Sequence, residues 1–158
     1  MSDNSTFINK YRPYRLTDFY TNDKFKQAVN TLISVDDINI LFIGNNNSGK
    51  TSLLNTLIRE YYDLSTTDSL PENNILFVNN LKEQGIQYFR NDMKTFCQSM
   101  SSIYGKKKLV LIDDIDTINE QSQQVFRNYI DKYRNNIQFI CVCNNVQKVV
   151  ESIQSRLH

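Results

Sequence analysis

Two glycines, a lysine and a threonine lie together at a spacing that could hold phosphate. The stretch is Gly44-Asn45-Asn46-Asn47-Ser48-Gly49-Lys50-Thr51, which fits the pattern G-x-x-x-x-G-K-T. Glycines let such a loop curl until backbone N–H groups point at an anion, and a following helix adds its positive end. Lys50 would then reach the β- and γ-phosphates, and the Thr51 hydroxyl would bind Mg²⁺. We therefore predict that this stretch and the adjoining Ser52 bind ATP with Mg²⁺.

Carboxylates follow a second apolar stretch. Leu109-Val110-Leu111-Ile112 has the composition of a buried strand and runs into Asp113-Asp114-Ile115-Asp116. Ligands of open α/β sheets bind at the carboxyl ends of strands, so Asp113 is predicted to hold Mg²⁺ beside the loop. Asp114 is predicted to orient or deprotonate the water that attacks the γ-phosphate. Alone, the pattern is equally typical of a solvated acidic turn, and the upstream loop favours the functional interpretation.

Two polar residues nearer the end of the chain, Asn144 and Arg156, are further candidates for contact with nucleotide. Asn144 comes after an apolar run and could contact the γ-phosphate or its water. Arg156 could serve as an arginine finger toward the nucleotide of a neighbouring subunit. On spacing alone, a turn-forming asparagine and a solvated arginine are the simpler interpretations.

The elements that must position these residues alternate between short apolar strands and helices. Strands are predicted at residues 38–43, 75–78, 109–112 and 137–143, helices at 22–35, 50–62, 86–100, 119–133 and 146–153, and turns at 82–85 and 104–108. This alternation predicts an α/β fold of three layers, with a parallel sheet covered on both faces. Residues 1–37 would form an arm and a first helix, residues 38–158 the core, and the whole effectively one domain.

Composition and charge argue against a secreted protein, a membrane protein or a metal centre. The 158 residues carry 18 Lys and Arg against 17 Asp and Glu, so any contact with nucleic acid would need a local patch. The polar start lacks the apolar run of a signal peptide, and no apolar run could span a bilayer, so we expect an intracellular protein without membrane contact. Three cysteines and one histidine, His158, indicate buried free thiols rather than a metal centre.

Six stretches occur in the order, and close to the spacing, of one family. They are Lys10-Tyr11-Arg12-Pro13, residues 44–51, Gly85-Ile86 with residues 90–96, the strand into residues 113–116, residues 139–144, and Ile153-Gln154-Ser155-Arg156. Together they resemble the small subunits of replication factor C, the AAA+ sliding-clamp loader of archaea and eukaryotes. The resemblance covers residues 9–157 and implies a P-loop NTPase core that binds ATP.

The resemblance implies a role for each matching residue around the nucleotide. The arm Tyr11-Arg12-Pro13 corresponds to the segment that closes over the adenine. Lys50 and Thr51 correspond to the Walker A pair, Asp113 to the Walker B magnesium ligand and Asn144 to sensor 1.

The resemblance also implies partners. Arg156 corresponds to the arginine of the Ser-Arg-Cys motif, which reaches the ATP of the adjacent subunit. Arg90 and Lys94 correspond to residues that line the DNA channel, although solvated helix charges are an equal alternative. The expected partners are other clamp-loader subunits, a sliding clamp and primer-template DNA.

Departures from the family pattern leave two functions open. Asp114 stands where the family has Glu, one methylene longer, so hydrolysis could be slow or lost while binding survives. Thr21-Asn22 replaces Gly-Gln and Leu157 replaces the motif cysteine. The chain also stops before the helical lid and collar, as expected of a fragment, a split gene product or a reduced form. The alternative to an ATPase is a subunit that binds nucleotide without hydrolysing it and supplies an arginine finger to a partner. A third class, the small-molecule kinases, would need arginines in a lid, and residues 64–74 contain none.

Overall fold

The computed structural model describes residues 12–79 and 81–158, with the backbone alone for residues 81–89. Its described residues form two compact units. The smaller unit combines the chain up to Val35 with Gly49–Leu70, and the larger unit combines Asp36–Ser48 with Pro71–His158. No helix in the described part of the chain is long and apolar enough to cross a bilayer.

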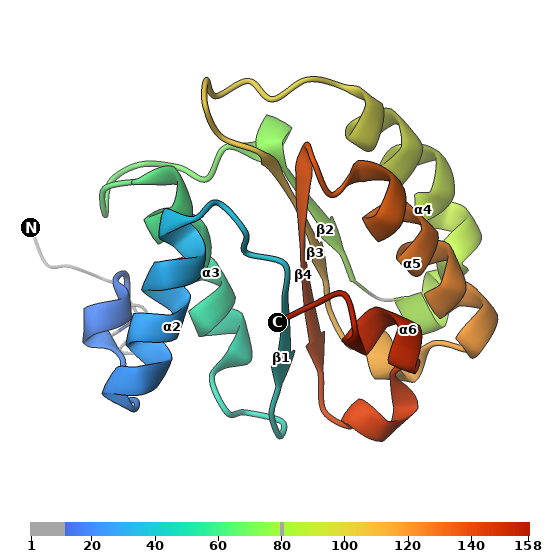
Figure 1. Ribbon diagram of the computed structural model, residues 1–158, viewed down its shortest axis with the longest axis horizontal. Coiled ribbons are helices and arrows are strands. Elements are labelled where there is room, and N and C mark those ends of the chain that lie inside the picture. Colours follow the sequence, from blue (N-terminus) through green and yellow to red (C-terminus); the bar gives the residue numbers. More distant parts are fainter. Residues whose placement is uncertain (1–11, 80) are drawn as a thin grey trace, which may run out of the picture. The chain divides into compact units, whose positions relative to one another are not determined.

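The larger unit contains a sheet of four parallel strands (Figure 1). They are β1 (Ile40–Ile43), β2 (Ile75–Val78), β3 (Lys108–Ile112) and β4 (Ile137–Cys143). The strand order is β1-β4-β3-β2, so β4 pairs with both β1 and β3. Because all the strands run in the same direction, their carboxyl ends meet at one edge of the sheet. The predicted α/β fold with a parallel sheet is confirmed.

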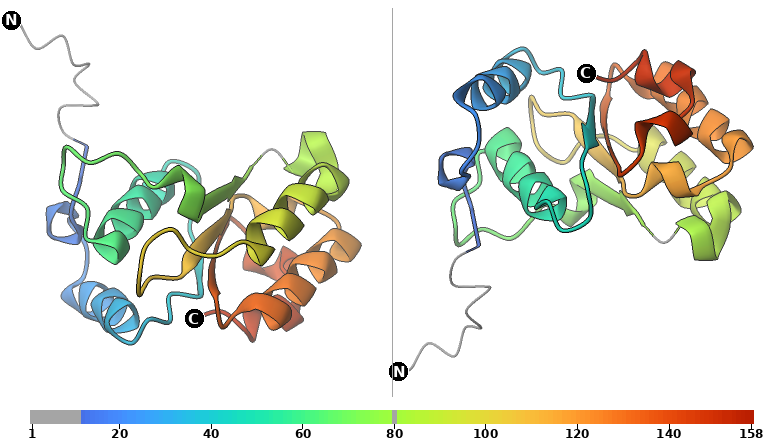
Figure 2. Two further views of the ribbon diagram at one scale, coloured as in Figure 1. Left: turned by 90° about the horizontal axis from the view of Figure 1, so that it is seen from above. Right: turned by 90° about the horizontal axis from the view of Figure 1, so that it is seen from below.

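Three helices of the same unit cover one face of this sheet (Figures 1 and 2). They are α4 (Leu81–Gln98), α5 (Glu120–Tyr133) and the short α6 (Glu151–Gln154). The side chain of Asn119 caps α5 by accepting from the Ser122 N–H. Apolar side chains of the helices and of the strands form the core between them: Met93, Phe126, Ile130, Ile153, Val110, Ile112, Phe139 and Cys141.

The smaller unit contains α2 (Asp23–Ser34), α3 (Lys50–Tyr62) and a 3₁₀ turn at Leu16–Asp18. Helix α3 holds this turn and the segment that precedes it. The Glu60 carboxylate accepts from the Leu16 N–H at 3.0 Å, and the Thr56 hydroxyl donates to the Pro13 carbonyl at 3.2 Å. These contacts attach the N-terminal segment to the helix that follows the glycine loop.

Two predicted boundaries are wrong. The turn expected at residues 82–85 lies inside α4, because a single glycine costs a helix interior only about 1 kcal/mol and does not end it. The helix expected at residues 146–153 is broken into a 3₁₀ turn, Val146–Lys148, and α6. The break falls at Val149 and Val150, which have extended ψ angles of 127° and 138°. Two consecutive β-branched residues favour that backbone over a helix.

Lys108 was expected in a charged turn, yet it opens β3 and is only 2% exposed. Its ammonium donates to the Phe96 carbonyl at 2.6 Å and to the Ser99 hydroxyl at 2.5 Å, at the end of α4. Burial lowers the pKa of this ammonium. The position is stable because a cation satisfies carbonyls at the negative end of a helix.

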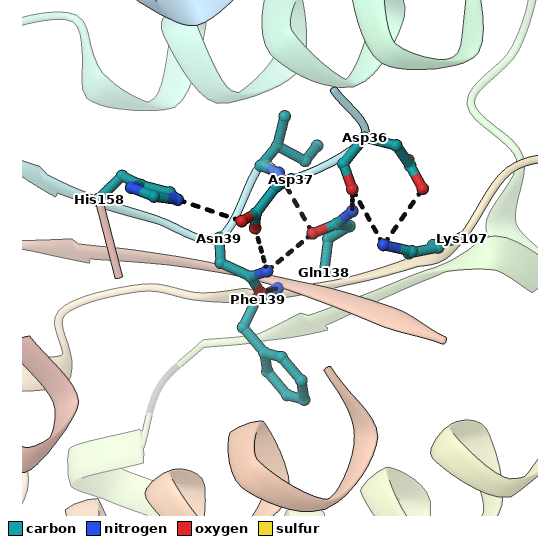
Figure 3. Close-up of polar contacts among 8 residues, drawn as sticks. Asp36, Asp37, Asn39, Lys107, Gln138, Phe139 and His158 are labelled. Carbon is teal, nitrogen blue, oxygen red and sulfur yellow. Dashed lines mark hydrogen bonds and ion pairs between the residues drawn. The ribbon is translucent and has the colours of Figure 1, made fainter. Parts of the chain in front are cut away.

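A buried polar cluster joins β1 to β4 at their amino ends (Figure 3). Asn39 is its centre: its side-chain oxygen accepts from the Phe139 N–H at 2.9 Å, and its amide donates to Asp37 at 2.7 Å and to Gln138 at 2.9 Å. Gln138 in turn donates to the Asp36 carbonyl at 2.6 Å, which also accepts from Lys107. These contacts satisfy polar groups that the sheet buries.

Replacing Asn39 with alanine is expected to lower the free energy of unfolding by about 2–3 kcal/mol, because the buried Phe139 N–H loses its acceptor. Urea unfolding followed by circular dichroism measures the change. The exposed Asn135 is the matched control, and Asn135→Ala should stay within about 0.5 kcal/mol of wild type. Equal unfolding midpoints for the two variants would show that the cluster is not stabilising.

The three thiols, Cys97, Cys141 and Cys143, are free and buried, as predicted. Burial raises the pKa of Cys97 to about 12, partly offset by the charge of Lys108, and burial also raises the pKa of Cys141. Because the thiolate is the reactive form, labelling of the folded chain by Ellman's reagent at mildly alkaline pH should be about a hundredfold slower than after guanidinium unfolding. Rapid labelling of the folded chain would contradict the burial of these thiols.

Candidate functional site

The carboxyl ends of β1, β4 and β3 bring four predicted residues to one edge of the sheet. The first residue after β1, Gly44, donates its N–H to the carbonyl of Cys143, the last residue of β4, at 3.1 Å. Asn144 follows directly, and Asp113 and Asp114 follow the neighbouring β3. Gly44, Asn144 and the two carboxylates therefore end three adjacent strands.

Hydrogen bonds link the carboxylates to Asn144. The Asp114 N–H donates to Asp113 Oδ1 at 3.0 Å, and the Asn144 amide lies 3.4 Å from Asp114 Oδ1. Asp114 has a φ of 48°, a left-handed conformation that Asp and Asn tolerate better than most residues. This backbone turns the chain sharply at the end of β3, which leaves the Asp114 side chain exposed.

Asp116 also belongs to this group, although the sequence suggested no role for it. Its Oδ2 accepts from the N–H groups of Asn144 at 3.3 Å and Asn145 at 2.9 Å. These two bonds fix the backbone that carries the Asn144 side chain. The partners are 28 and 29 residues apart, so spacing alone could not have identified the contact.

The loop of residues 44–49 has the backbone expected for a curled turn. The Ser48 N–H donates to the Asn45 carbonyl at 3.2 Å, and φ is positive at Asn47 (61°) and at Gly49 (85°). No atom lies within 4 Å of the position of a Cβ at Gly49, so glycine is favoured there by its φ angle and not by crowding.

The start of α3, in the smaller unit, follows this loop along the chain and carries three more of the predicted ligands. Its first residues are Lys50, Thr51 and Ser52, at the positive end of a helix 13 residues long. Backbone N–H groups and a lysine suit phosphate, and the oxygen ligands Thr51 and Asp113 suit Mg²⁺. The residues present thus have the donor chemistry that a magnesium nucleotide requires.

The N-terminal arm is described from Arg12 onward, and Tyr11 lies outside the described residues. Arg12, Pro13 and Tyr14 line a cavity of about 180 Å³ together with side chains of α3 and of the loop after it, Asn55, Arg59 and Leu70. The guanidinium of Arg59 lies 5.4 Å from the centre of the Tyr14 ring. A planar aromatic ligand could enter such a cavity between polar and aromatic groups.

Three basic residues of the larger unit lie on α4 or directly after α6. Arg156 follows α6 and pairs with Asp131 of α5 at 2.5 Å. Arg90 and Lys94 are exposed one turn apart on α4, and the Tyr129 hydroxyl donates to the Arg90 carbonyl at 3.3 Å. No hydrogen bond in the described part of the chain joins these basic side chains to the carboxylates after β3.

Comparison with known families gives a match over most of the chain. The family model described as "ATPase family associated with various cellular activities (AAA)" matches residues 40–158. A probable replication factor C subunit 5 from Dictyostelium discoideum is 30% identical over 153 residues, covering 95% of this chain and 43% of that protein. A replication factor C small subunit from Methanocella arvoryzae is 28% identical over 157 residues, covering 99% of this chain and 47% of that protein. The resemblance found in the motifs is confirmed.

Solved structures show the same fold. A RuvB variant from Thermotoga maritima superposes with a TM-score of 0.65 at 17% identity, covering 93% of this chain and 46% of that one. A DNA polymerase III gamma subunit-related protein from the same organism gives a TM-score of 0.61 at 16% identity, covering 82% of this chain and 44% of that one. The present chain spans just under half the length of these relatives.

Proposed function

Because the chain belongs to the AAA family of ATPases, we propose that it is the ATP-binding module of a clamp loader. It binds MgATP, assembles with similar subunits and helps to load a sliding clamp onto primer-template DNA. The observation that carries the proposal is the meeting of Gly44, Asn144 and Asp113 at the ends of three adjacent strands. The similarity to replication factor C subunits supports the clamp-loading role.

In the proposed reaction, the loop and the start of α3 bind the phosphates, and the carboxylates after β3 act on the metal ion and the water. Lys50 and the N–H groups at the start of α3 bind the phosphates. Thr51 and Asp113 would hold Mg²⁺, which would supply charge neutralisation at the phosphate oxygens. Asp114 orients a water molecule and accepts its proton as the bond from water oxygen to the γ-phosphorus forms and the bond to the β-phosphate oxygen breaks. The Asn144 amide, 3.4 Å from Asp114, keeps that carboxylate oriented.

Other residues would contact the partners. Tyr11, Arg12 and Pro13 enclose the base, and Arg156 reaches the nucleotide of the adjacent subunit. Arg90 and Lys94, exposed on one side of α4, contact DNA phosphates without sequence preference. An intracellular location follows from this role.

Calorimetric titration with ATP in the presence of Mg²⁺ tests the nucleotide site directly. Steady-state phosphate release is then measured with and without a sliding clamp and primed DNA. We expect saturable binding at one site per chain and release that the clamp and DNA stimulate. Absence of ATP binding would overturn the proposal, and binding without stimulation would remove the clamp-loading role.

The short side chain of Asp114 favours a second function, which is nucleotide binding without hydrolysis. Asp114 carries its carboxylate one methylene short of the family's glutamate, and its backbone is held by the bond to Asp113. A water molecule held by a longer carboxylate would then lie out of its reach. In that case the chain binds nucleotide without hydrolysing it, and it contributes Arg156 to a partner that hydrolyses.

A further inference from the structure

The side chain of Arg156 is held by a carboxylate from a different helix. Its Nε donates to Asp131 Oδ1 at 2.5 Å and its Nη2 donates to Asp131 Oδ2 at 3.1 Å. The contact is therefore bidentate and uses one edge of the guanidinium plane. Nη1 donates to the Ser152 carbonyl at 2.5 Å, which fixes a second direction in the same plane.

The backbone on both sides of Arg156 is held as well. The Arg156 N–H donates to the carbonyl of the fully buried Ile153 at 3.0 Å. Two residues later, the His158 N–H donates to the Asn39 carbonyl at 2.8 Å, and the Leu41 N–H donates to the His158 carbonyl at 3.0 Å. This pairing lays the segment along the edge of β1, and the His158 ring lies 3.3 Å from the Asp37 carboxylate (Figure 3).

Asp131 lies on α5, 25 residues before Arg156, and it has a second cationic neighbour. Arg127, one turn earlier on the same helix, lies 3.5 Å from Asp131 Oδ2. The hydrogen bond from Arg156 lowers the pKa of Asp131 below its usual range, so the carboxylate stays ionised at neutral pH. The pair is partly exposed, with 27% of the Arg156 side chain and 42% of the Asp131 side chain accessible. The arginine is thus ordered and still open to an approaching ligand.

An arginine that acts on a phosphate bound by another subunit must be both ordered and accessible. A guanidinium has five N–H groups in a rigid plane, and Nη2 keeps one N–H beyond its bond to Asp131. An unrestrained arginine samples many rotamers, and ordering it during the reaction would slow phosphate transfer. A carboxylate on the Nε edge removes that freedom and leaves the second Nη2 N–H for a phosphate oxygen, while Nη1 is held by the Ser152 carbonyl and lies 3.4 Å from the Ser155 hydroxyl.

We infer that Asp131 is a positioning residue, which orients Arg156 toward the γ-phosphate of ATP bound by a neighbouring copy of the chain. The inference rests on the proposed function and adds a residue to it. Asp131 touches no reacting atom, so its effect must pass through Arg156. Its loss should therefore lower the turnover rate and leave the KM for ATP unchanged.

A mixture of two variants of the 158-residue chain separates nucleotide binding from donation of the arginine. An acceptor chain carrying Arg156→Ala keeps the nucleotide site, and a donor chain carrying Lys50→Ala keeps the arginine. Neither should hydrolyse ATP alone, and hydrolysis should return on mixing. Asp131→Asn in the donor should lower the restored turnover about tenfold to a hundredfold at unchanged KM, and Asp131→Glu should recover part of the loss.

Two controls test the assignment. Asp131→Asn in the acceptor, where the arginine is already absent, should cause no further loss. Arg127→Gln in the donor removes the other neighbour of Asp131 and should have little effect. Full turnover with the Asp131→Asn donor, or an equal loss when Asp131→Asn is placed in the acceptor, would overturn the role of Asp131. Either result would leave the proposed function intact. If mixing the Arg156→Ala and Lys50→Ala chains restores no hydrolysis, Arg156 does not act on the nucleotide of a neighbouring subunit. That result would overturn this part of the proposed function, and the role of Asp131 with it.

Discussion

Replacing Lys50 with alanine is expected to weaken binding of MgATP about a hundredfold. The lysine follows Gly49, the residue whose φ of 85° ends the loop, and it is the first residue of α3. Its ammonium would contact the β- and γ-phosphates, where a charge-assisted hydrogen bond contributes about 2–3 kcal/mol. A loss of that size corresponds to about two orders of magnitude in the dissociation constant. Calorimetric titration of both proteins with MgATP measures it.

The same titration with a second lysine variant distinguishes a local contact from general electrostatics. Lys24 is exposed on α2, in the same compact unit as Lys50, and Lys24→Ala removes the same charge. We expect this control to bind MgATP within about twofold of wild type, since water and salt screen a solvent-exposed charge that does not contact the ligand directly. Equal losses in both variants would show that the loop does not hold the phosphates.

The sequence predicts the fold well where the signals are local. Apolar runs bounded by turn residues locate all four strands to within two residues, because each strand is short and buried. The side chain of Asn22 and that of Asn119 cap α2 and α5 near the predicted helix starts. The error at Lys108 arises where long-range contacts outweigh local preference, because its buried ammonium binds the Phe96 carbonyl at the end of α4. The errors at residues 82–85 and 146–153 are local, because one glycine does not end a helix and two β-branched valines interrupt one.

The candidate site is predicted by its motifs, whereas the residues that support it are not. Gly44, Asp113, Asp114 and Asn144 are identified from the strands that precede them, and the strand order brings them together. Asp116 and Asp131 make contacts 28 and 25 residues away, which depend on how the strands and helices pack. Neither a spacing rule nor composition contains that information, so these residues emerge only from the three-dimensional arrangement.

Replacing Asp114 with glutamate is expected to raise MgATP turnover about a hundredfold. The added methylene extends the carboxylate by more than 1 Å toward the water that attacks the γ-phosphate, and a displacement of about 1 Å in a catalytic group changes rates by roughly that factor. The left-handed backbone at residue 114, with its φ of 48°, suits Asp better than Glu. We therefore expect the variant to be less stable by up to about 1 kcal/mol.

Three side chains at this position separate the two proposed functions. Asp114→Asn keeps the size of the side chain but cannot accept a proton, so its turnover should fall below that of wild type while its affinity for MgATP is retained. Asp114→Glu should exceed wild type at similar affinity. If all three proteins bind MgATP and release phosphate at the same low rate, the carboxylate does not limit hydrolysis. The chain would then act through nucleotide binding and the arginine it presents to a partner, and the source of catalysis would lie in that partner.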